Sequence, residues 1–116
     1  MKVRGEQEGG VLLLHLEGDD CLDCSTAAAV RSQVLEQIDG GSDVVVDLSR
    51  VQFIDSAGLG VLISVFKATR KNGCKARFAG VRPEVRHVME IIHLNRILEL
   101  SPNVATAIQE LGAHPA

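Results

Sequence analysis

One short segment, Asp55-Ser56-Ala57-Gly58-Leu59-Gly60, places a carboxylate, a hydroxyl and two glycines close together. Apolar residues recur at helical spacing from Leu59 onward, so we expect a helix that opens here, with Ser56 at or next to its N-cap. A phosphate on Ser56 would be tolerated, because free amides and the positive dipole end gather at a helix start. The glycines cost the helix about 1 kcal/mol each and leave its backbone bare for another surface. The segment therefore suits a switch by phosphorylation.

A structural interpretation of the same residues stays open, since Asp55 or Ser56 would serve equally well as a plain helix cap. Catalytic interpretations fit less well. Ile54 occupies the position where a nucleophile elbow needs glycine, and no Gly-Lys-Ser/Thr sequence follows as in a phosphate-binding loop. No His, Cys or Lys lies between Asp47 and Phe66 to activate the serine, so we do not expect an enzyme.

Cys21 and Cys24 form a Cys-x-x-Cys pair just before the first expected helix. This spacing can serve redox chemistry or half a zinc site. No second pair of Cys or His completes four ligands, so we expect no metal and no cofactor. A redox effect of the pair on partner docking stays a hypothesis, and a local packing role is the simpler interpretation. The three cysteines, an odd number, do not indicate a disulfide framework.

Alternating strands and helices position these residues. Gly9-Gly10 separates Lys2–Glu8 from the apolar run Val11–Leu16, which predicts a hairpin. The further strands expected are Val44–Leu48, covered on both faces, Lys75–Ala79 and Ile97–Leu100. The helices expected begin at a Ser25 or Thr26 cap, after Asp55, at Pro83 and at Ser101-Pro102, the last ending near Leu111. This order predicts a mostly parallel sheet with packed helices.

The helices show apolar residues at helical spacing, which we expect to face the core. They are Val30, Val34 and Ile38 in the first helix, Leu59, Leu62, Ile63 and Phe66 in the second, and Val85, Val88, Met89 and Ile92 in the third. His15 is expected to be a strand residue without a ligand role.

Length and composition narrow the function classes. The 116 residues fit one domain, residues 1–116. A formal charge of −3 and only 3 aromatic residues, all Phe, disfavour nucleic-acid binding. No apolar run approaches the roughly 20 residues of a membrane span, and the N-terminus lacks a signal-peptide segment. We therefore expect a cytoplasmic protein that binds neither nucleic acid nor membrane.

The sequence resembles the STAS domain family of anti-sigma factor antagonists, also called anti-anti-sigma factors. The residues that carry the resemblance are Val44–Leu48, Phe53–Leu62, Lys71–Gly73, Val81–Val85 and Leu94–Leu98. The resemblance implies an α/β, STAS-like fold. Its sheet would be mixed and mostly parallel, with four to five strands and about four helices packed mainly on one face.

The resemblance also implies a mechanism. The family's phosphorylated serine follows the aspartate of Asp-Ser-x-Gly-Leu-Gly, which corresponds to Ser56. The partner would be an anti-sigma factor that is also a serine kinase with a histidine-kinase-like ATP fold. It would bind the unmodified protein, release its sigma factor and phosphorylate Ser56, and a PP2C-like phosphatase would reverse this. The partner-binding residues implied are Asp23, Asp55, Ser56, Ala57, Gly58, Leu59 and Gly60.

One departure concerns Asp23, because Gly18 lies two residues further upstream than the family pattern places it. The loop before the first helix is therefore longer here. A second function stays open as well. The chain could be a STAS scaffold or regulatory subunit of a larger complex in a stressosome, in lipid transport or in secretion control. An intact Asp55-Ser56 pair favours the phosphorylated binding module, since a pure scaffold does not need a phosphorylatable residue.

Overall fold

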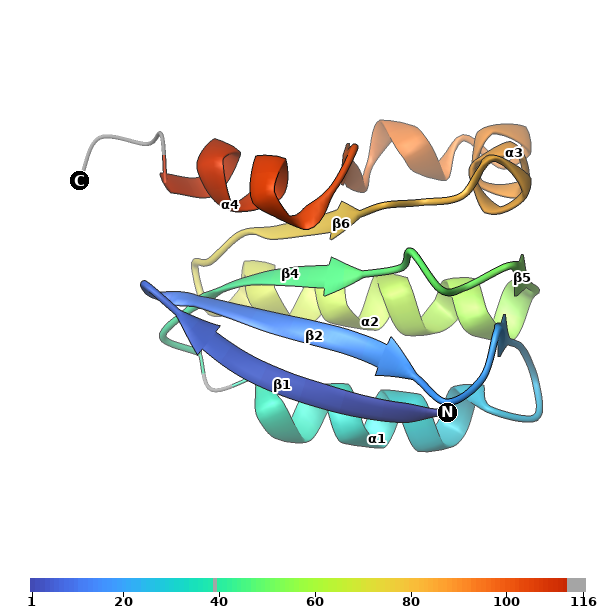
Figure 1. The fold of residues 1–116 in the computed structure, drawn as a ribbon, viewed down its shortest axis with the longest axis horizontal. Coiled ribbons are helices and arrows are strands. Elements are labelled where there is room, and N and C mark those ends of the chain that lie inside the picture. The colour runs from blue at the N-terminus through green and yellow to red at the C-terminus, as the bar shows by residue number, and fades with distance from the viewer. Residues whose placement is uncertain (39, 113–116) are drawn as a thin grey trace.

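The computed structural model describes residues 1–38 and 40–112. Its main sheet has five strands in the order β1-β2-β4-β6-β7 (Figure 1). Strands β1 and β2 pair antiparallel, and the other neighbours pair parallel. The predicted hairpin and the mostly parallel sheet are therefore confirmed. The strands are β1 (Lys2–Glu8), β2 (Val11–Glu17), β4 (Asp43–Asp47), β6 (Ala76–Ala79) and β7 (Glu99–Ser101).

Helices cover the two faces of this sheet unequally (Figure 1). Helices α1 and α2 pack beside each other on one face, and α4 contacts β4, β6 and β7 on the other. The helices are α1 (Ala27–Gln37), α2 (Ser56–Lys71), α3 (Pro83–Ile91) and α4 (Val104–Gly112), with a 3-10 turn η1 (Leu94–Arg96). Within residues 1–38 and 40–112, no helix has both the length and the hydropathy of a membrane span.

Strand β4 shows why the sheet is covered on both faces. Successive strand side chains point to opposite faces. Val44 and Val46 join the larger apolar cluster, which includes residues of α1, α2 and α3. Val45, between them, joins a smaller cluster with Ala107 and Leu111 of α4. The continuous apolar run thus forms a central strand, as predicted.

The region after α3 corrects two predictions. Ile92 is not part of an inner helical face: α3 ends at Ile91, and Ile92 is 52 % exposed. The last strand is Glu99–Ser101 and not Ile97–Leu100, because the turn η1 comes first and leaves Ile97 56 % exposed. His93, at a φ of 60°, lies between the helix and the turn and redirects the chain. The apolar spacing alone could not predict that α3 ends at Ile91, because Ile92 continues that spacing.

A second, two-stranded sheet was not predicted. It consists of β3 (Cys21–Leu22) and β5 (Phe53–Ile54), paired parallel with Leu22 opposite Ile54. Strand β3 ends where the loop before α1 begins, and β5 ends just before α2 begins. The small sheet therefore brings the loop before α1 against the segment that opens α2.

Candidate partner-binding site at the start of helix α2

Asp55 and Ser56 were both candidates for the cap of helix α2, and the sequence could not decide between them. Asp55 is the N-cap of α2, and its Oδ1 accepts a hydrogen bond from the Gly58 amide at 3.0 Å. Ser56 is the first residue of the helix and is exposed. Its hydroxyl makes no hydrogen bond to any residue in the described part of the chain. The cap is therefore the aspartate, and the serine hydroxyl is accessible.

The second oxygen of Asp55 reaches across to the other helix start. Oδ2 accepts a hydrogen bond from the backbone amide of Cys24 at 2.9 Å. The Asp55 amide in turn donates to the carbonyl of Leu22 at 3.4 Å. One side chain thus connects α2 to the loop that precedes α1. This arrangement holds the two segments as one surface around Ser56.

The glycines of the segment differ in what surrounds them. A Cβ at Gly58 would lie 2.1 Å from the Leu22 carbonyl oxygen and 2.7 Å from Ile54 Cγ1. The surface that approaches Gly58 is therefore the protein's own β3, not the outer surface that the bare backbone was expected to admit. Gly60 is half-buried, and the nearest atom to a Cβ there would be Arg31 Nη2 at 3.4 Å. Only Gly60 leaves its helix face open.

The residues predicted to bind a partner therefore fall into two groups. Gly58 and Leu59 are buried, so they support the site from below. Ser56 is exposed, whereas Asp23, Asp55, Ala57 and Gly60 are partly exposed.

The start of α1 lacks the side-chain cap that was predicted for it. Thr26 stands at the N-cap position without a capping hydrogen bond. Its hydroxyl instead accepts from the Asp23 amide at 3.0 Å and donates to the Cys21 carbonyl at 3.0 Å. Ser25 does not cap the helix either, because its hydroxyl donates to Asp23 Oδ1 at 2.6 Å. Short polar side chains bond their own loop here in place of the helix.

Asp23 is held by these loop contacts. Besides the Ser25 hydroxyl, its Oδ1 accepts a hydrogen bond from the Ser25 amide at 2.9 Å. The Ser25 hydroxyl, and to a smaller extent the Ser25 amide, favour the charged carboxylate and lower the pKa of Asp23 below its ordinary value. Asp23 thus lies beside the start of α2 as an anion whose position is fixed.

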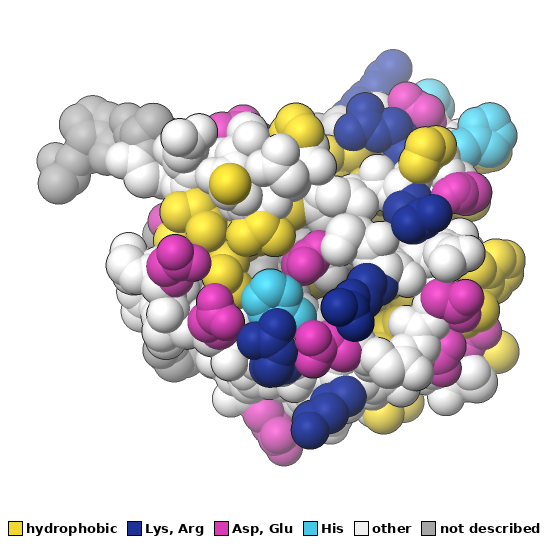
Figure 2. Space-filling model, viewed as in Figure 1, with side chains coloured by type: hydrophobic (Ala, Val, Ile, Leu, Met, Phe, Trp, Pro, Cys, Tyr) yellow, Lys and Arg dark blue, Asp and Glu magenta, His cyan; other side chains and the backbone are white. Residues whose placement is uncertain are grey.

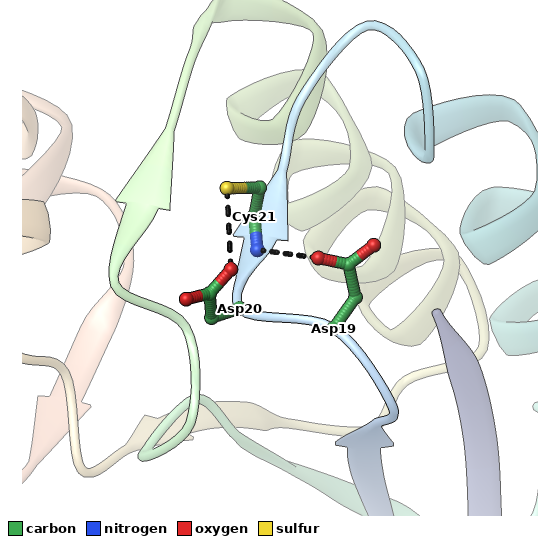
Figure 3. Close-up of side chains that lie close together, drawn as sticks. All are labelled: Asp19, Asp20 and Cys21. Atoms are coloured by element: carbon green, nitrogen blue, oxygen red, sulfur yellow. Dashed lines mark hydrogen bonds between the residues drawn. The ribbon is translucent and has the colours of Figure 1, made fainter.

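Figure 3 shows the acidic side chains around Cys21 at the beginning of β3. Asp19 Oδ1 accepts from the Cys21 amide at 3.2 Å, and Asp20 Oδ1 accepts from its thiol at 3.4 Å. The bond to Asp20 raises the pKa of the thiol above its ordinary value, which makes the thiolate less available for attack on a disulfide. Cys21 and Cys24 are both free thiols. The redox hypothesis for the pair stays a prediction.

The sheet face shown in Figure 2 carries acidic and basic side chains intermixed. No extended region of one sign appears on that face, whereas a nucleic-acid surface concentrates Lys and Arg. His15 of β2 lies with its Nδ1 3.3 Å from Asp47 Oδ2 of the neighbouring strand. The histidine is thus a strand residue paired with a carboxylate.

Comparison with known proteins identifies the family of the chain. The STAS domain family matches this chain over residues 2–107. The chain belongs to that family. It is 31 % identical over 113 residues to the anti-sigma F factor antagonist of Paenibacillus polymyxa, covering 96 % of this chain and 95 % of that protein.

Solved structures agree on the STAS fold. An anti-sigma factor antagonist from Mycobacterium paratuberculosis superposes with a TM-score of 0.84 at 22 % identity, covering 96 % of this chain and 93 % of that one. The anti-sigma factor antagonist SpoIIAA in its unphosphorylated form gives a TM-score of 0.72 at 16 % identity, covering 97 % and 100 %. The predicted family and α/β fold are therefore confirmed.

Three features of the candidate site could not be predicted from the sequence. They are the bond from the Cys24 amide to Asp55, the packing of the Leu22 carbonyl on Gly58, and the position of Arg31 beside Gly60. All three are contacts between segments far apart in the chain. No periodicity or spacing in one sequence indicates them.

Proposed function

We propose that this chain is an anti-sigma factor antagonist. Its unmodified form binds an anti-sigma factor through the start of α2 and the loop at Asp23, and thereby releases a sigma factor. The relatives' names support this proposal, as does the accessible hydroxyl of Ser56 next to an aspartate that already caps the helix. The chain acts as one domain, residues 1–116, in the cytoplasm, and has no catalytic role of its own.

Phosphorylation of Ser56 is the switch in this proposal. The partner anti-sigma factor is a serine kinase with a histidine-kinase-like ATP fold. The Ser56 oxygen attacks the γ-phosphorus of ATP, a new O–P bond forms, the bond to ADP breaks, and the hydroxyl proton passes to a base on the kinase or to water. A PP2C-like phosphatase hydrolyses the ester and releases inorganic phosphate.

The fold tolerates this modification because Asp55, not Ser56, satisfies the Gly58 amide. The phosphate adds about −1.5 to −2 charges to the exposed surface. An interface that closes over it must remove its water and accept the repulsion of Asp23 and Asp55. Each 1.4 kcal/mol lost lowers the affinity about tenfold, so a few kcal/mol suffice to dissociate a tight complex.

The decisive experiment incubates the protein with the candidate kinase from the same genome and ATP, followed by mass spectrometry. We expect one phosphate, on Ser56, and none on the Ser56→Ala variant. Ser32→Ala is the matched control, because Ser32 is also an exposed helical serine, on α1. It should be labelled like the wild type. A phosphate on any residue other than Ser56 would contradict the site assignment.

A second experiment tests the switch itself. Ser56→Asp should weaken binding to the anti-sigma factor at least about 100-fold in calorimetry, an effect of about 2.8 kcal/mol. Its circular dichroism spectrum and Tm should match those of the wild type. Unchanged affinity would refute the switch. A substantially lower Tm would show that Ser56 has a structural role at the helix start instead.

A further inference from the structure

Arg31 of α1 lies against the open face of α2 beside Gly60. Its Nη2 is 3.4 Å from the position that a Gly60 Cβ would occupy. Arg31 is exposed, and its guanidinium makes no ion pair or hydrogen bond with any residue of ranges 1–38 and 40–112. An exposed arginine that lies against a neighbouring helix and has no carboxylate partner has a cationic group available for another anion.

Gly60 and Ser56 share one face of α2, because they are four residues apart. Their Cβ positions are therefore about 5–6 Å from each other. A helical Cα–Cβ bond also tilts toward the helix N-terminus, so the Gly60 Cβ position lies over the turn that contains Ser56. The Arg31 guanidinium is consequently within a side-chain rotation of a group attached to the Ser56 oxygen.

Two carboxylates belong to the segments that meet at Ser56, and both are already engaged. Asp55 uses its two oxygens for the Gly58 and Cys24 amides. Asp23 accepts from Ser25. A phosphate on Ser56 would lie beside these carboxylates, and Arg31 lies one turn further along the same face of α2. A side chain at position 60 larger than alanine would occupy the path between them.

We propose that Arg31 forms an ion pair with the phosphate of phosphorylated Ser56, and that Gly60 provides the space for this contact. The inference rests on the proposed function only for the place of the modification. Arg31 is then a positioning residue of the switched-off state. It orients the phosphate along α2 and offsets part of its repulsion from Asp23 and Asp55.

The test installs phosphoserine at position 56 during translation by an expanded genetic code, so that no kinase is needed. A nearby cation favours the dianion, so the second pKa of the phosphate, ordinarily about 6, should be lowered. A ³¹P NMR titration should therefore show a midpoint about half a pH unit lower in the otherwise wild-type protein than in Arg31→Gln. The Arg31 ¹H–¹⁵Nε resonance should also shift between the unmodified and phosphorylated proteins.

Two further variants sharpen the result. Lys71→Gln removes the same charge at the far end of α2 and should titrate like the wild type. Gly60→Leu keeps Arg31 but fills the space between Arg31 and Ser56. Its phosphate should therefore titrate with the same midpoint as in Arg31→Gln. Equal midpoints for wild type and Arg31→Gln, or an unshifted Arg31 resonance, would overturn the ion pair. Because the phosphate is installed without a kinase, failure of the candidate kinase to label Ser56 would count against the proposed function and leave this measurement intact.

Discussion

Two exposed serines at helix starts, Ser25 and Ser56, each lie close to an aspartate, yet only one has a free hydroxyl. Ser25 donates to Asp23 at 2.6 Å. Asp55 instead accepts only backbone amides, from Gly58 and Cys24, and its neighbour Ser56 has no partner among the described residues. The bond holds the Ser25 hydroxyl against its own loop, whereas the Ser56 hydroxyl is free to rotate toward another surface. The partners of each aspartate thus decide which serine has a free hydroxyl.

The difference arises from the backbone around each aspartate. Asp55 is extended, at a φ of −115° and a ψ of −172°, which turns its side chain toward the first free amides of α2. Asp23 lies three residues before the N-cap position of α1, and its carbonyl accepts the amides of Thr26 and Ala27. Its side chain is left to the nearest loop donors, which belong to Ser25.

The largest effect expected on stability is at Gly58, whose packing holds the α2 start in place. Gly58→Ala places a Cβ 2.1 Å from the Leu22 carbonyl oxygen, which is backbone and must move. Overpacking costs about 1–3 kcal/mol or more, against a gain of about 1 kcal/mol in helix propensity. We expect a net loss of about 2 kcal/mol in urea denaturation followed by circular dichroism.

Gly60→Ala is the matched control for that substitution. Its Cβ meets only the flexible end of Arg31, at 3.4 Å, so the variant should equal the wild type or gain up to about 1 kcal/mol. Equal destabilisation at the two positions would show that the contact with Leu22 does not hold the site.

The next effect is at Asp55 and tests whether it joins the two helix starts. Asp55→Ala removes acceptors for both the Gly58 and the Cys24 amides. Loss of an N-cap costs about 1 kcal/mol, and the exposed Cys24 amide regains water, so we expect a loss of about 1–2 kcal/mol. Hydrogen exchange should accelerate at both amides.

Ser56→Ala is the control for Asp55→Ala, since the serine side chain makes no contact that the cap needs. It should leave the denaturation midpoint and both exchange rates unchanged. Faster exchange at Gly58 alone in Asp55→Ala would contradict a connection to the loop before α1, and would reduce Asp55 to an ordinary cap.

The sequence predicted most of the main sheet and the start of α2, because these depend on local patterns. The run around Val44–Leu48 and the helical spacing from Leu59 are strong signals of a buried strand and an amphipathic helix. The segment at Ser56 was identified correctly as a helix opening, but two candidate caps remained. Both residue types cap helices well, so only the observed backbone could separate them.

The missed features depend on contacts between distant segments. Strands of two residues, such as β3 and β5, show no periodicity. Thr26 was a reasonable cap by residue type, but the loop amide of Asp23 competes successfully for its hydroxyl. The glycine at position 58 was interpreted as an opening toward a partner, whereas its space is used by the protein itself. A glycine in a sequence shows that close approach is allowed and does not show which surface approaches.

The smallest effect expected is a change in the pKa of Asp23, and it tests the hydrogen bond between Ser25 and Asp23. The Ser25 hydroxyl is the main cause that lowers the pKa of Asp23. Ser25→Ala should therefore raise this pKa toward the ordinary aspartate value near 4, as measured by the ¹³Cγ chemical shift. Ser56→Ala should leave it unchanged, because Ser56 does not bond Asp23.

The pH dependence of stability has a definite sign for this group. A carboxyl whose pKa is lowered by folding stabilises the protein above its unfolded pKa, near 4, and the contribution disappears as the pH falls through the folded pKa. The difference in denaturation midpoint between wild type and Ser25→Ala should thus be constant from pH 5 upward and shrink in more acidic solution. A difference that grows on acidification would mean that Ser25 does not bond the carboxylate, and the hydroxyls of Ser25 and Ser56 would then be equally free.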